Sequence, residues 1–227
     1  MPDKMQGFGL LTPIQKAFLS AFATLPDQLQ FYLTGGTALA EYYFGHRISF
    51  DLDFFTSVDG LILPISYQIE KVCAVHGLQV SVVRRFTSFV EFLVTQEKDS
   101  QKVDLALDSP YRFAPPVLAD TGVYVNDYAD LRVDKLLTYF GRAEPRDAVD
   151  LYFILQKDPL QTLLEQAAKK DPGFDLYWFA AALNRAKSFP DEAERWPVKM
   201  VKPFEPMEIK RKFQGLALEL MGRAAKK

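Results

Sequence analysis

The chain has 227 residues, of which 48% are hydrophobic and 14% are aromatic, and its formal net charge at pH 7 is −2. Such a composition excludes a largely disordered chain, and a net charge this close to zero does not indicate a nucleic-acid-binding protein. The single cysteine, Cys73, excludes an internal disulfide, and the two histidines, His46 and His76, are too few to indicate a zinc site.

The N-terminal stretch does not resemble a signal peptide, because residues 1–10 are polar and contain glycine. No apolar run in the sequence approaches the length of a membrane span. We therefore expect a cytoplasmic protein that does not bind a membrane.

The hydrophobic pattern predicts alternating helices and strands over the first half of the chain. A polar turn at 96–100 is expected to join the last two strands as a hairpin. The expected elements are a helix over 11–23, a strand over 29–33, a helix over 38–44, a strand around 51–53, a helix over 64–75, and strands over 78–83, 89–94 and 101–108.

A glycine turn, Gly35-Gly36-Thr37, joins the first predicted strand to the helix that follows. Such a turn leaves backbone N–H groups unpaired at the positive end of a helix, where they face an anion, and phosphate is the anion we expect. The Thr37 hydroxyl either caps the helix or contacts the phosphate, and the sequence does not separate these roles. A Gly-Gly turn is common, but an Asp-x-Asp strand close behind it strengthens the interpretation.

Asp51 and Asp53 stand two residues apart in an apolar, aromatic stretch, as in a strand that directs both acids to one face and buries Leu52 behind them. Carboxylates about 6.6 Å apart repel by about 2.5 kcal/mol at an effective dielectric of about 20. A divalent cation would turn that repulsion into binding energy, and hard carboxylate oxygens indicate Mg²⁺. The alternative is that both acids only bracket a loop or cap the next helix.

A third acid, Asp104, lies among apolar residues in the second strand of the predicted hairpin. It either joins the other two acids or is a solvated residue on the open face of the sheet. Asp108, which precedes Ser109 and Pro110, is more simply explained as a turn residue.

Two helices are expected after the sheet. The first spans 127–140, with acids in its first turn and Gly141 as its end. The second begins near Pro145, and the spacing of Arg146, Asp147 and Asp150 puts these charges on one face. A purely structural interpretation is that Arg146 and Asp150 form an ordinary ion pair and that Lys135 of the first helix is a solvated lysine.

From residue 160 onward the pattern is helical, with prolines as breaks and a loop or linker expected over 191–206 before a last helix. Basic residues collect in this region, where they either bind an RNA backbone or form a solvated helix face. They are Lys199, Lys202, Lys210, Arg211, Lys212, Arg223, Lys226 and Lys227.

The chain resembles the AbiEii/AbiGii toxin family of nucleotidyltransferases in its motifs and their order. These motifs are the glycine turn and the stretches 47–53, 102–104 and 135–152. The family belongs to the polymerase-beta-like nucleotidyltransferase superfamily. The resemblance covers roughly residues 29–156. One departure from the wider superfamily is Gly-Gly-Thr where Gly-Ser is usual, a variant common in the toxin branch. The resemblance implies an α+β fold, with a mixed sheet flanked by helices over 1–125 and a helical region over 126–227 that completes the active site.

The resemblance also implies the roles of individual residues. Asp104 would lie nearest the attacking hydroxyl and serve as its base, and Asp150 would join the wall of the active site. The residues implied to bind the nucleotide are Gly35, Gly36, Thr37, Lys135 and Arg146. The residues implied to act in catalysis are Asp51, Asp53, Asp104, Lys135 and Asp147, of which the first three would hold Mg²⁺.

The implied activity is Mg²⁺-dependent transfer of a nucleoside monophosphate from a nucleoside triphosphate to an acceptor hydroxyl. An RNA, with a tRNA 3′ end as the leading choice, is the expected acceptor, and a protein side chain is the second. The family also implies a toxin of a toxin–antitoxin system with a cognate antitoxin protein as partner. Two alternatives stay open: a nucleotidyltransferase that acts on a small molecule, and a nucleotide-binding protein without catalysis, against which the three acids argue.

Overall fold

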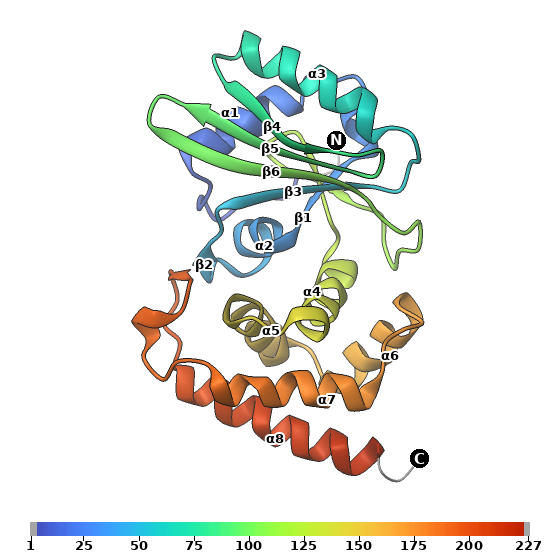
Figure 1. Ribbon diagram of the computed structural model, residues 1–227, viewed down its shortest axis with the longest axis vertical. Coiled ribbons are helices and arrows are strands. Elements are labelled where there is room, and N and C mark those ends of the chain that lie inside the picture. Colours follow the sequence, from blue (N-terminus) through green and yellow to red (C-terminus); the bar gives the residue numbers. More distant parts are fainter. Residues whose placement is uncertain (1–3, 225–227) are drawn as a thin grey trace. The chain divides into compact units, whose positions relative to one another are not determined.

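The computed structural model describes residues 4–224 (Figure 1). The chain divides into two compact units, Met1–Tyr128 and Ala129–Lys227. The first unit contains a mixed sheet with helices, and the second is mainly helical. The expected α+β fold with a helical C-terminal part is therefore confirmed.

The first unit alternates strands with helical segments along the chain. Its one long crossover helix follows the acidic strand. The elements are α1 (Pro13–Phe22), η1 (Gln28–Gln30), β1 (Tyr32–Thr34), α2 (Gly35–Leu39), η2 (Ala40–Phe44), β2 (Arg47–Ile48), β3 (Asp51–Thr56), α3 (Ile62–Val75), β4 (Gln79–Arg85), β5 (Phe89–Gln96), β6 (Asp99–Leu107), β7 (Val117–Leu118) and β8 (Tyr124–Val125).

Within residues 4–224, seven strands form one sheet in the order β4-β5-β6-β3-β1-β8-β7. The neighbours β4, β5 and β6 are antiparallel, whereas β3 runs parallel to β6 and antiparallel to β1. Parallel neighbours need a long connection, and the chain between β3 and β6 supplies it as α3, β4 and β5. This topology places the acidic strand β3 in the middle of the sheet.

One face of the sheet is apolar and is covered by α1 and α3 (Figure 1). Alternate residues of β3, Leu52 and Phe54, point to this face and are fully buried. Phe54 contacts two rings of α1, Phe18 and Phe22, and the centroid of the Phe22 ring lies 4.2 Å from its own. Cys73 of α3 is a core residue as expected, and burial raises the pKa of its thiol to about 12.

Two predicted boundaries in this unit are wrong. The strand expected over 29–33 begins only at Tyr32, because Leu29 lies in a 3₁₀ turn with 60% of its surface exposed and has no sheet face to cover. The helix expected over 38–44 begins at Gly35 and continues as a π-helical turn to Phe44. Gly45 then ends it with a left-handed φ of 58°.

The second unit packs helices around a core that includes Tyr139 and Phe213, whose ring centroids are 5.2 Å apart. The loop expected over 191–206 contains one 3₁₀ turn and one short strand. The elements are α4 (Tyr128–Arg142), α5 (Pro145–Lys157), α6 (Leu160–Lys170), α7 (Leu176–Asn184), η3 (Arg185–Ser188), η4 (Ala193–Arg195), β9 (Lys199–Met200) and α8 (Pro206–Ala224).

The prediction that Gly141 ends its helix is wrong, because α4 continues to Arg142. Ala143 instead takes the left-handed conformation, with φ of 49°, and its N–H donates to the carbonyl of Tyr139 at 2.9 Å. A glycine inside a helix costs only about 1 kcal/mol relative to alanine, so packing elsewhere in α4 offsets it.

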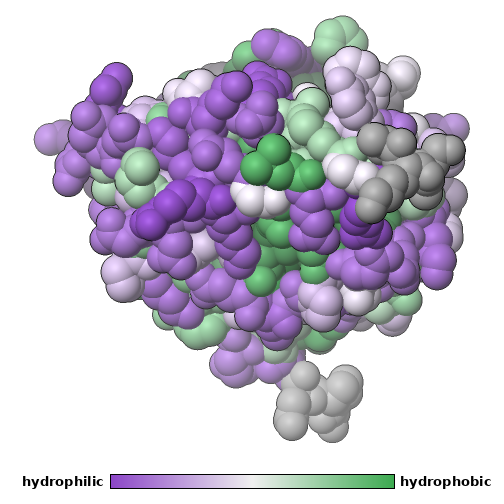
Figure 2. Space-filling view, turned by 90° about the horizontal axis from the view of Figure 1, so that it is seen from below, coloured by the Kyte–Doolittle hydropathy of each residue, from purple (hydrophilic) through white to green (hydrophobic). Residues whose placement is uncertain are grey.

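Figure 2 shows one face of the molecule as mostly hydrophilic with a short apolar strip. Exposed apolar side chains of the last helix, α8, are Met207 and Leu218. None of the helices within residues 4–224 combines the length and the apolar character that crossing a bilayer requires.

We predict that Phe54→Ala lowers the free energy of unfolding of the sheet unit by about 3–5 kcal/mol, because it opens a cavity between β3 and α1. Phe50→Ala is the matched control, since the Phe50 side chain is 56% exposed. Urea denaturation followed by circular dichroism measures both. A loss for Phe54→Ala no larger than that for Phe50→Ala would contradict the described core.

Candidate active site

The open face of the sheet carries polar side chains in register across five strands. Thr34 of β1 pairs with Asp53 of β3, and Asp53 pairs with Asp104 of β6. Asp104 pairs in turn with Glu91 of β5, and Glu91 pairs with Arg84 of β4. Because directly paired residues share a face, all five side chains point away from the apolar core. The β3–β6 pairing thus makes Asp53 and Asp104 neighbours.

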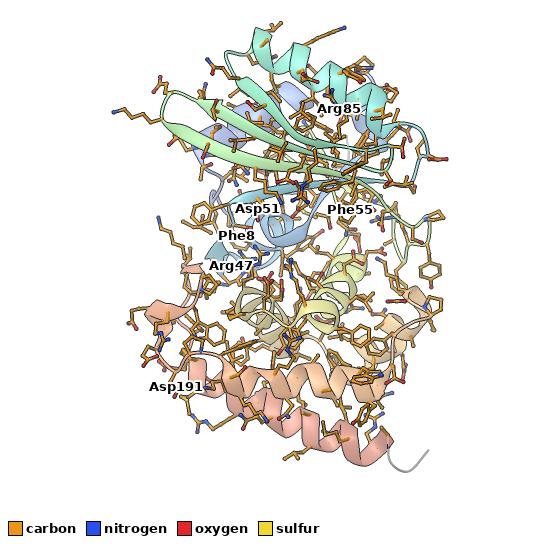
Figure 3. The ribbon with its side chains drawn as sticks, in the orientation of Figure 1. Phe8, Arg47, Asp51, Phe55, Arg85 and Asp191 are labelled. Atoms are coloured by element: carbon orange, nitrogen blue, oxygen red, sulfur yellow. The ribbon has the colours of Figure 1, made fainter. Side chains whose placement is uncertain are left out.

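A second row lies two residues earlier on β3 and β6, where Asp51 pairs with Lys102. The Lys102 ammonium donates a hydrogen bond to Asp104 Oδ2 at 2.7 Å. Figure 3 labels Asp51 on β3, with Arg47 beside α2. The three acids singled out in the sequence therefore share one face, in two adjacent rows of the sheet.

The glycine turn lies directly against Asp53. Gly35 has a left-handed φ of 71°, and a Cβ built on it would lie 2.1 Å from Asp53 Oδ2. A Cβ on Gly36 would lie 2.5 Å from Arg47 Nη2 and 2.7 Å from Ser49 Oγ. A side chain at Gly35 would displace the Asp53 carboxylate and strain the left-handed backbone, whereas one at Gly36 would only shift the ends of the Arg47 and Ser49 side chains.

Thr37 does not cap the helix. Its side chain is buried, and its hydroxyl donates a hydrogen bond to the backbone carbonyl of Asp51. The residue at the helix N-cap position is Thr34. Thr37 thus fixes the first residue of the acidic strand.

Two buried glutamines donate hydrogen bonds to the backbone carbonyls of the two residues just before Asp51. Gln15 Nε2 donates to the carbonyl of Ser49 at 2.9 Å, and Gln101 Nε2 donates to the carbonyl of Phe50. With Thr37, side-chain donors thus hold successive carbonyls where the chain enters β3. Neither glutamine was predicted from the sequence, although Gln101 stands in phase with the buried positions of β6, a pattern that indicates a buried polar role.

The Asp104 carboxyl is half-buried and has charged neighbours of both signs. Burial raises the pKa of its carboxyl above the ordinary value, and the hydrogen bond and charge of Lys102 only partly oppose this, while Glu91 and Asp51 add to it. Burial alone would lower the pKa of the Lys102 ammonium, but Asp104, Glu91 and Asp51 together raise it. The acids around Lys102 thus favour its positively charged form.

The fit of this face to a magnesium ion can be judged from its donors. Asp51, Asp53 and Asp104 offer carboxylate oxygens, the hard ligands that Mg²⁺ prefers. Asp104 Oδ1 is buried without a hydrogen-bond partner among the described residues, so it can accept a cation. Within residues 4–224 no three acid, imidazole or thiol groups already stand in a metal-holding cluster, and Lys102 lies among the acids. The donor set fits Mg²⁺ provided that Lys102 moves.

In the second unit, Lys135 is not a solvated lysine. Its side chain is 7% exposed, and its ammonium lies 2.8 Å from Asp150 Oδ2, which is fully buried. This pair joins α4 to α5, because each residue comes from one of these helices. The structure therefore brings Lys135 and Asp150 together within the unit.

Asp147 is held by a neighbouring arginine. Arg142 donates to it through two parallel hydrogen bonds, Nε to Oδ2 at 2.6 Å and Nη2 to Oδ1 at 2.8 Å. Arg146 instead lies 3.1 Å from Glu144 and is 39% exposed. The three charges predicted to share a face thus have different partners: Asp147 pairs with Arg142, Asp150 with Lys135, and Arg146 with Glu144.

The basic stretch near the C-terminus is partly used inside its own unit. Lys210 is buried and donates to the carbonyl of Phe189 at 2.8 Å and to the carboxylate of Asp191. Arg223 donates to Gln161 Oε1 at 2.7 Å. Lys226 and Lys227 lie outside the described residues. Lys210 and Arg223 thus have partners inside their own unit, and RNA binding by this stretch stays a prediction.

The sequence matches the family described as nucleotidyl transferase AbiEii toxin, Type IV TA system, over residues 17–212. The protein aq_aa25 of Aquifex aeolicus (strain VF5), named as uncharacterized, is 33% identical over 145 residues. These residues are 63% of this chain and 66% of that protein. The chain thus spans slightly less than two thirds of the length of this relative.

Solved structures that are similar to the chain include MenT4 and JHP933. MenT4, a nucleotidyltransferase toxin from Mycobacterium tuberculosis H37Rv, has a TM-score of 0.56 and 15% identity, with 92% of this chain and 85% of that chain covered. JHP933 from Helicobacter pylori has a TM-score of 0.53 and 18% identity, with 93% and 90% covered. At these identities the likeness establishes a shared fold.

We predict that Gly35→Ala abolishes binding of nucleoside triphosphate, because the new Cβ would displace the Asp53 carboxylate. Gly60→Ala is the matched control: Gly60 has a similar φ of 75°, and a Cβ there meets nothing within 4 Å. Both variants should lose about 1 kcal/mol of stability from backbone strain. Isothermal titration with a triphosphate separates them, and equal binding by the two variants would contradict the role given to Gly35.

We also predict that Asp150→Asn destabilises the helical unit by about 3–5 kcal/mol, because it leaves the buried Lys135 ammonium without its counter-charge. The double variant Lys135→Met/Asp150→Asn should recover much of that loss, since it removes both charges. Chemical denaturation measures both variants. A double variant no more stable than Asp150→Asn alone would show that the pair does not account for the burial of these groups.

Proposed function

The chain belongs to the AbiEii family of nucleotidyl transferase toxins, and from that premise we propose that it transfers a nucleoside monophosphate from a nucleoside triphosphate to a hydroxyl of an RNA. A tRNA 3′ end is the leading acceptor. In this reaction the acceptor oxygen forms a bond to the α-phosphorus while the bond to pyrophosphate breaks, and the hydroxyl proton must be removed.

The adjacency of Gly35, Asp53 and Asp104 is the observation that supports this proposal most strongly. A turn able to present backbone N–H groups to phosphates lies against one carboxylate of a pair fixed by strand register. A solvated acid on an open sheet would have no need of such an arrangement. Combined with the family match, the arrangement favours nucleotidyl transfer over a nucleotide-binding role without catalysis.

Asp51, Asp53 and Asp104 are the residues that would hold Mg²⁺, with the phosphates of the substrate. The ion, when bound, neutralises charge on the triphosphate and on the leaving pyrophosphate. Gly35, Gly36 and Thr37 form the turn that receives the phosphates. The hydrogen bonds from Thr37, Gln15 and Gln101 act indirectly, because they fix the chain that enters β3.

Asp104 is the proposed base for the acceptor hydroxyl. Its Oδ1, which has no hydrogen-bond partner among the described residues, is the proposed proton acceptor, and its Oδ2 is the oxygen that Lys102 would release to the ion. A base must lie within hydrogen-bond reach of the proton that it removes, and the row shared with Asp53 puts Asp104 beside the other acid of the site.

The second unit is proposed to supply positive charge for the triphosphate. Asp150 fixes the ammonium of Lys135, and Arg142 fixes the carboxylate of Asp147, so each group is held in one orientation. Arg146, which is more exposed, is proposed as a further phosphate contact. These assignments rest on the family resemblance together with the contacts within the unit.

The biological setting that we propose follows from the family. The protein would act as the toxin of a toxin–antitoxin system in the cytoplasm, with an antitoxin protein encoded as its partner. Modification of an RNA needed for translation would then arrest growth when the protein is expressed. Induced expression without arrest would instead favour a nucleotidyltransferase that acts on a small molecule.

We predict that the purified protein, incubated with MgCl₂, total RNA and each α-³²P-labelled triphosphate in turn, transfers label to a discrete RNA band. Asp53→Asn should reduce this transfer by more than about 100-fold, because it removes a fixed charge that the reaction needs. Asp99→Asn is the matched control, since Asp99 is an exposed residue at the start of β6. Denaturing gels measure the label.

Three results would contradict the proposal. Label confined to protein would exclude RNA as the acceptor. Triphosphate binding without pyrophosphate release, with total RNA present, would indicate a binding protein. Undiminished transfer by Asp53→Asn would mean that the reaction takes place elsewhere.

A further inference from the structure

Lys102 places a positive charge among acids that are proposed to hold a metal ion. It pairs in register with Asp51, and its ammonium lies 2.7 Å from Asp104 Oδ2. Glu91 pairs with Asp104 from the next strand and also acts electrostatically on Lys102. Lys102 thus binds Asp104 directly and is attracted by Asp51 and Glu91, and Glu91 also pairs with Arg84 at 3.4 Å.

These acids need a positive charge even when no metal is bound. Carboxylates on directly paired strand positions are close enough to repel one another strongly, and opposed like charges destabilise a sheet. Asp104 is only 14% exposed, so water screens its charge poorly. Lys102 relieves this repulsion in the arrangement that the structure describes.

The Lys102 ammonium can also move away from Asp104. Its side chain is 42% exposed, and a lysine ammonium on a flexible four-carbon stem can take several positions without moving the backbone. Asp104 cannot move in the same way, because β6 is paired on both sides, with β3 and β5. A cation that displaces the ammonium therefore finds the carboxylates already in place.

We propose that Lys102 is a built-in counterion for Asp51, Asp104 and Glu91 that moves out when Mg²⁺ binds to Asp51, Asp53 and Asp104. This inference rests on the proposed function, because it requires Mg²⁺ at the acids of β3 and β6. It has two consequences. The metal-free protein is stabilised by Lys102, and Mg²⁺ alone binds more weakly than it would to the acids without the lysine.

A functional advantage follows from the chemistry of the substrate. The released ammonium needs a new anionic partner, and the triphosphate that arrives with Mg²⁺ supplies one. Lys102 would thus favour loading of metal and nucleotide together over loading of the metal by itself.

The test compares Lys102→Met with Lys98→Met, the exposed lysine in the β5–β6 turn. In EDTA, Lys102→Met should melt about 2–4 °C lower than the wild type, because Asp104 loses the counter-charge that is hydrogen-bonded to it. MgCl₂ titrated alone should bind to Lys102→Met about tenfold more tightly, the factor expected when no charge-assisted hydrogen bond has to be broken. Lys98→Met should match the wild type in both measurements.

The Asp53→Asn substitution, made in both the wild type and Lys102→Met, distinguishes a failure of this inference from a failure of the proposed function. Equal Mg²⁺ affinity for Lys102→Met and wild type, with RNA labelling that still depends on Asp53, would overturn the role of Lys102 alone. A melting temperature in EDTA that rises in Lys102→Met would do the same. If neither chain binds Mg²⁺ through Asp53 and no RNA is labelled, both the inference and the proposed function fail.

Discussion

The parallel pairing of β3 with β6 is the constraint on which the rest of this site depends. It places Asp53 opposite Asp104 and Asp51 opposite Lys102, and all four side chains share one face. The same alternation turns Leu52 and Phe54 into the core against α1. A slip of one residue would bury the acids and expose the core, so the packing of the apolar face specifies the register that the acidic face requires.

An acidic face of this kind is costly to assemble because its carboxylates repel one another, and two features of the surrounding structure keep it in place. Hydrogen bonds from Gln15, Gln101 and Thr37 fix the carbonyls at the start of β3, so the strand cannot relax to separate its charges. Lys102 supplies a counter-charge from within the face. The glycine turn completes the arrangement, because only a residue without a Cβ leaves room for Asp53 beside Gly35.

Much of this fold was predictable from short-range patterns, since alternation located the strands and the Asp-x-Asp spacing located the acidic face. Strand pairing was less accessible: that Asp53 opposes Asp104, and that a lysine lies between the acids, depends on register between segments about fifty residues apart. The predicted end of α4 was wrong because the glycine that suggested it is residue 141, whereas the residue with the left-handed conformation is Ala143. For Lys135 the residues alone left a solvated lysine open, because its partner, Asp150, lies on the next helix.

The most direct test is anomalous X-ray diffraction from crystals soaked with Mn²⁺ and a non-hydrolysable triphosphate analogue. Our account predicts an anomalous peak about 2.1 Å from carboxylate oxygens of both Asp53 and Asp104, with the triphosphate against the backbone N–H groups of Gly35 and Gly36. It also predicts that the Lys102 ammonium has left Asp104. A metal peak that does not touch these two acids, or a triphosphate bound away from the glycine turn, would contradict the account.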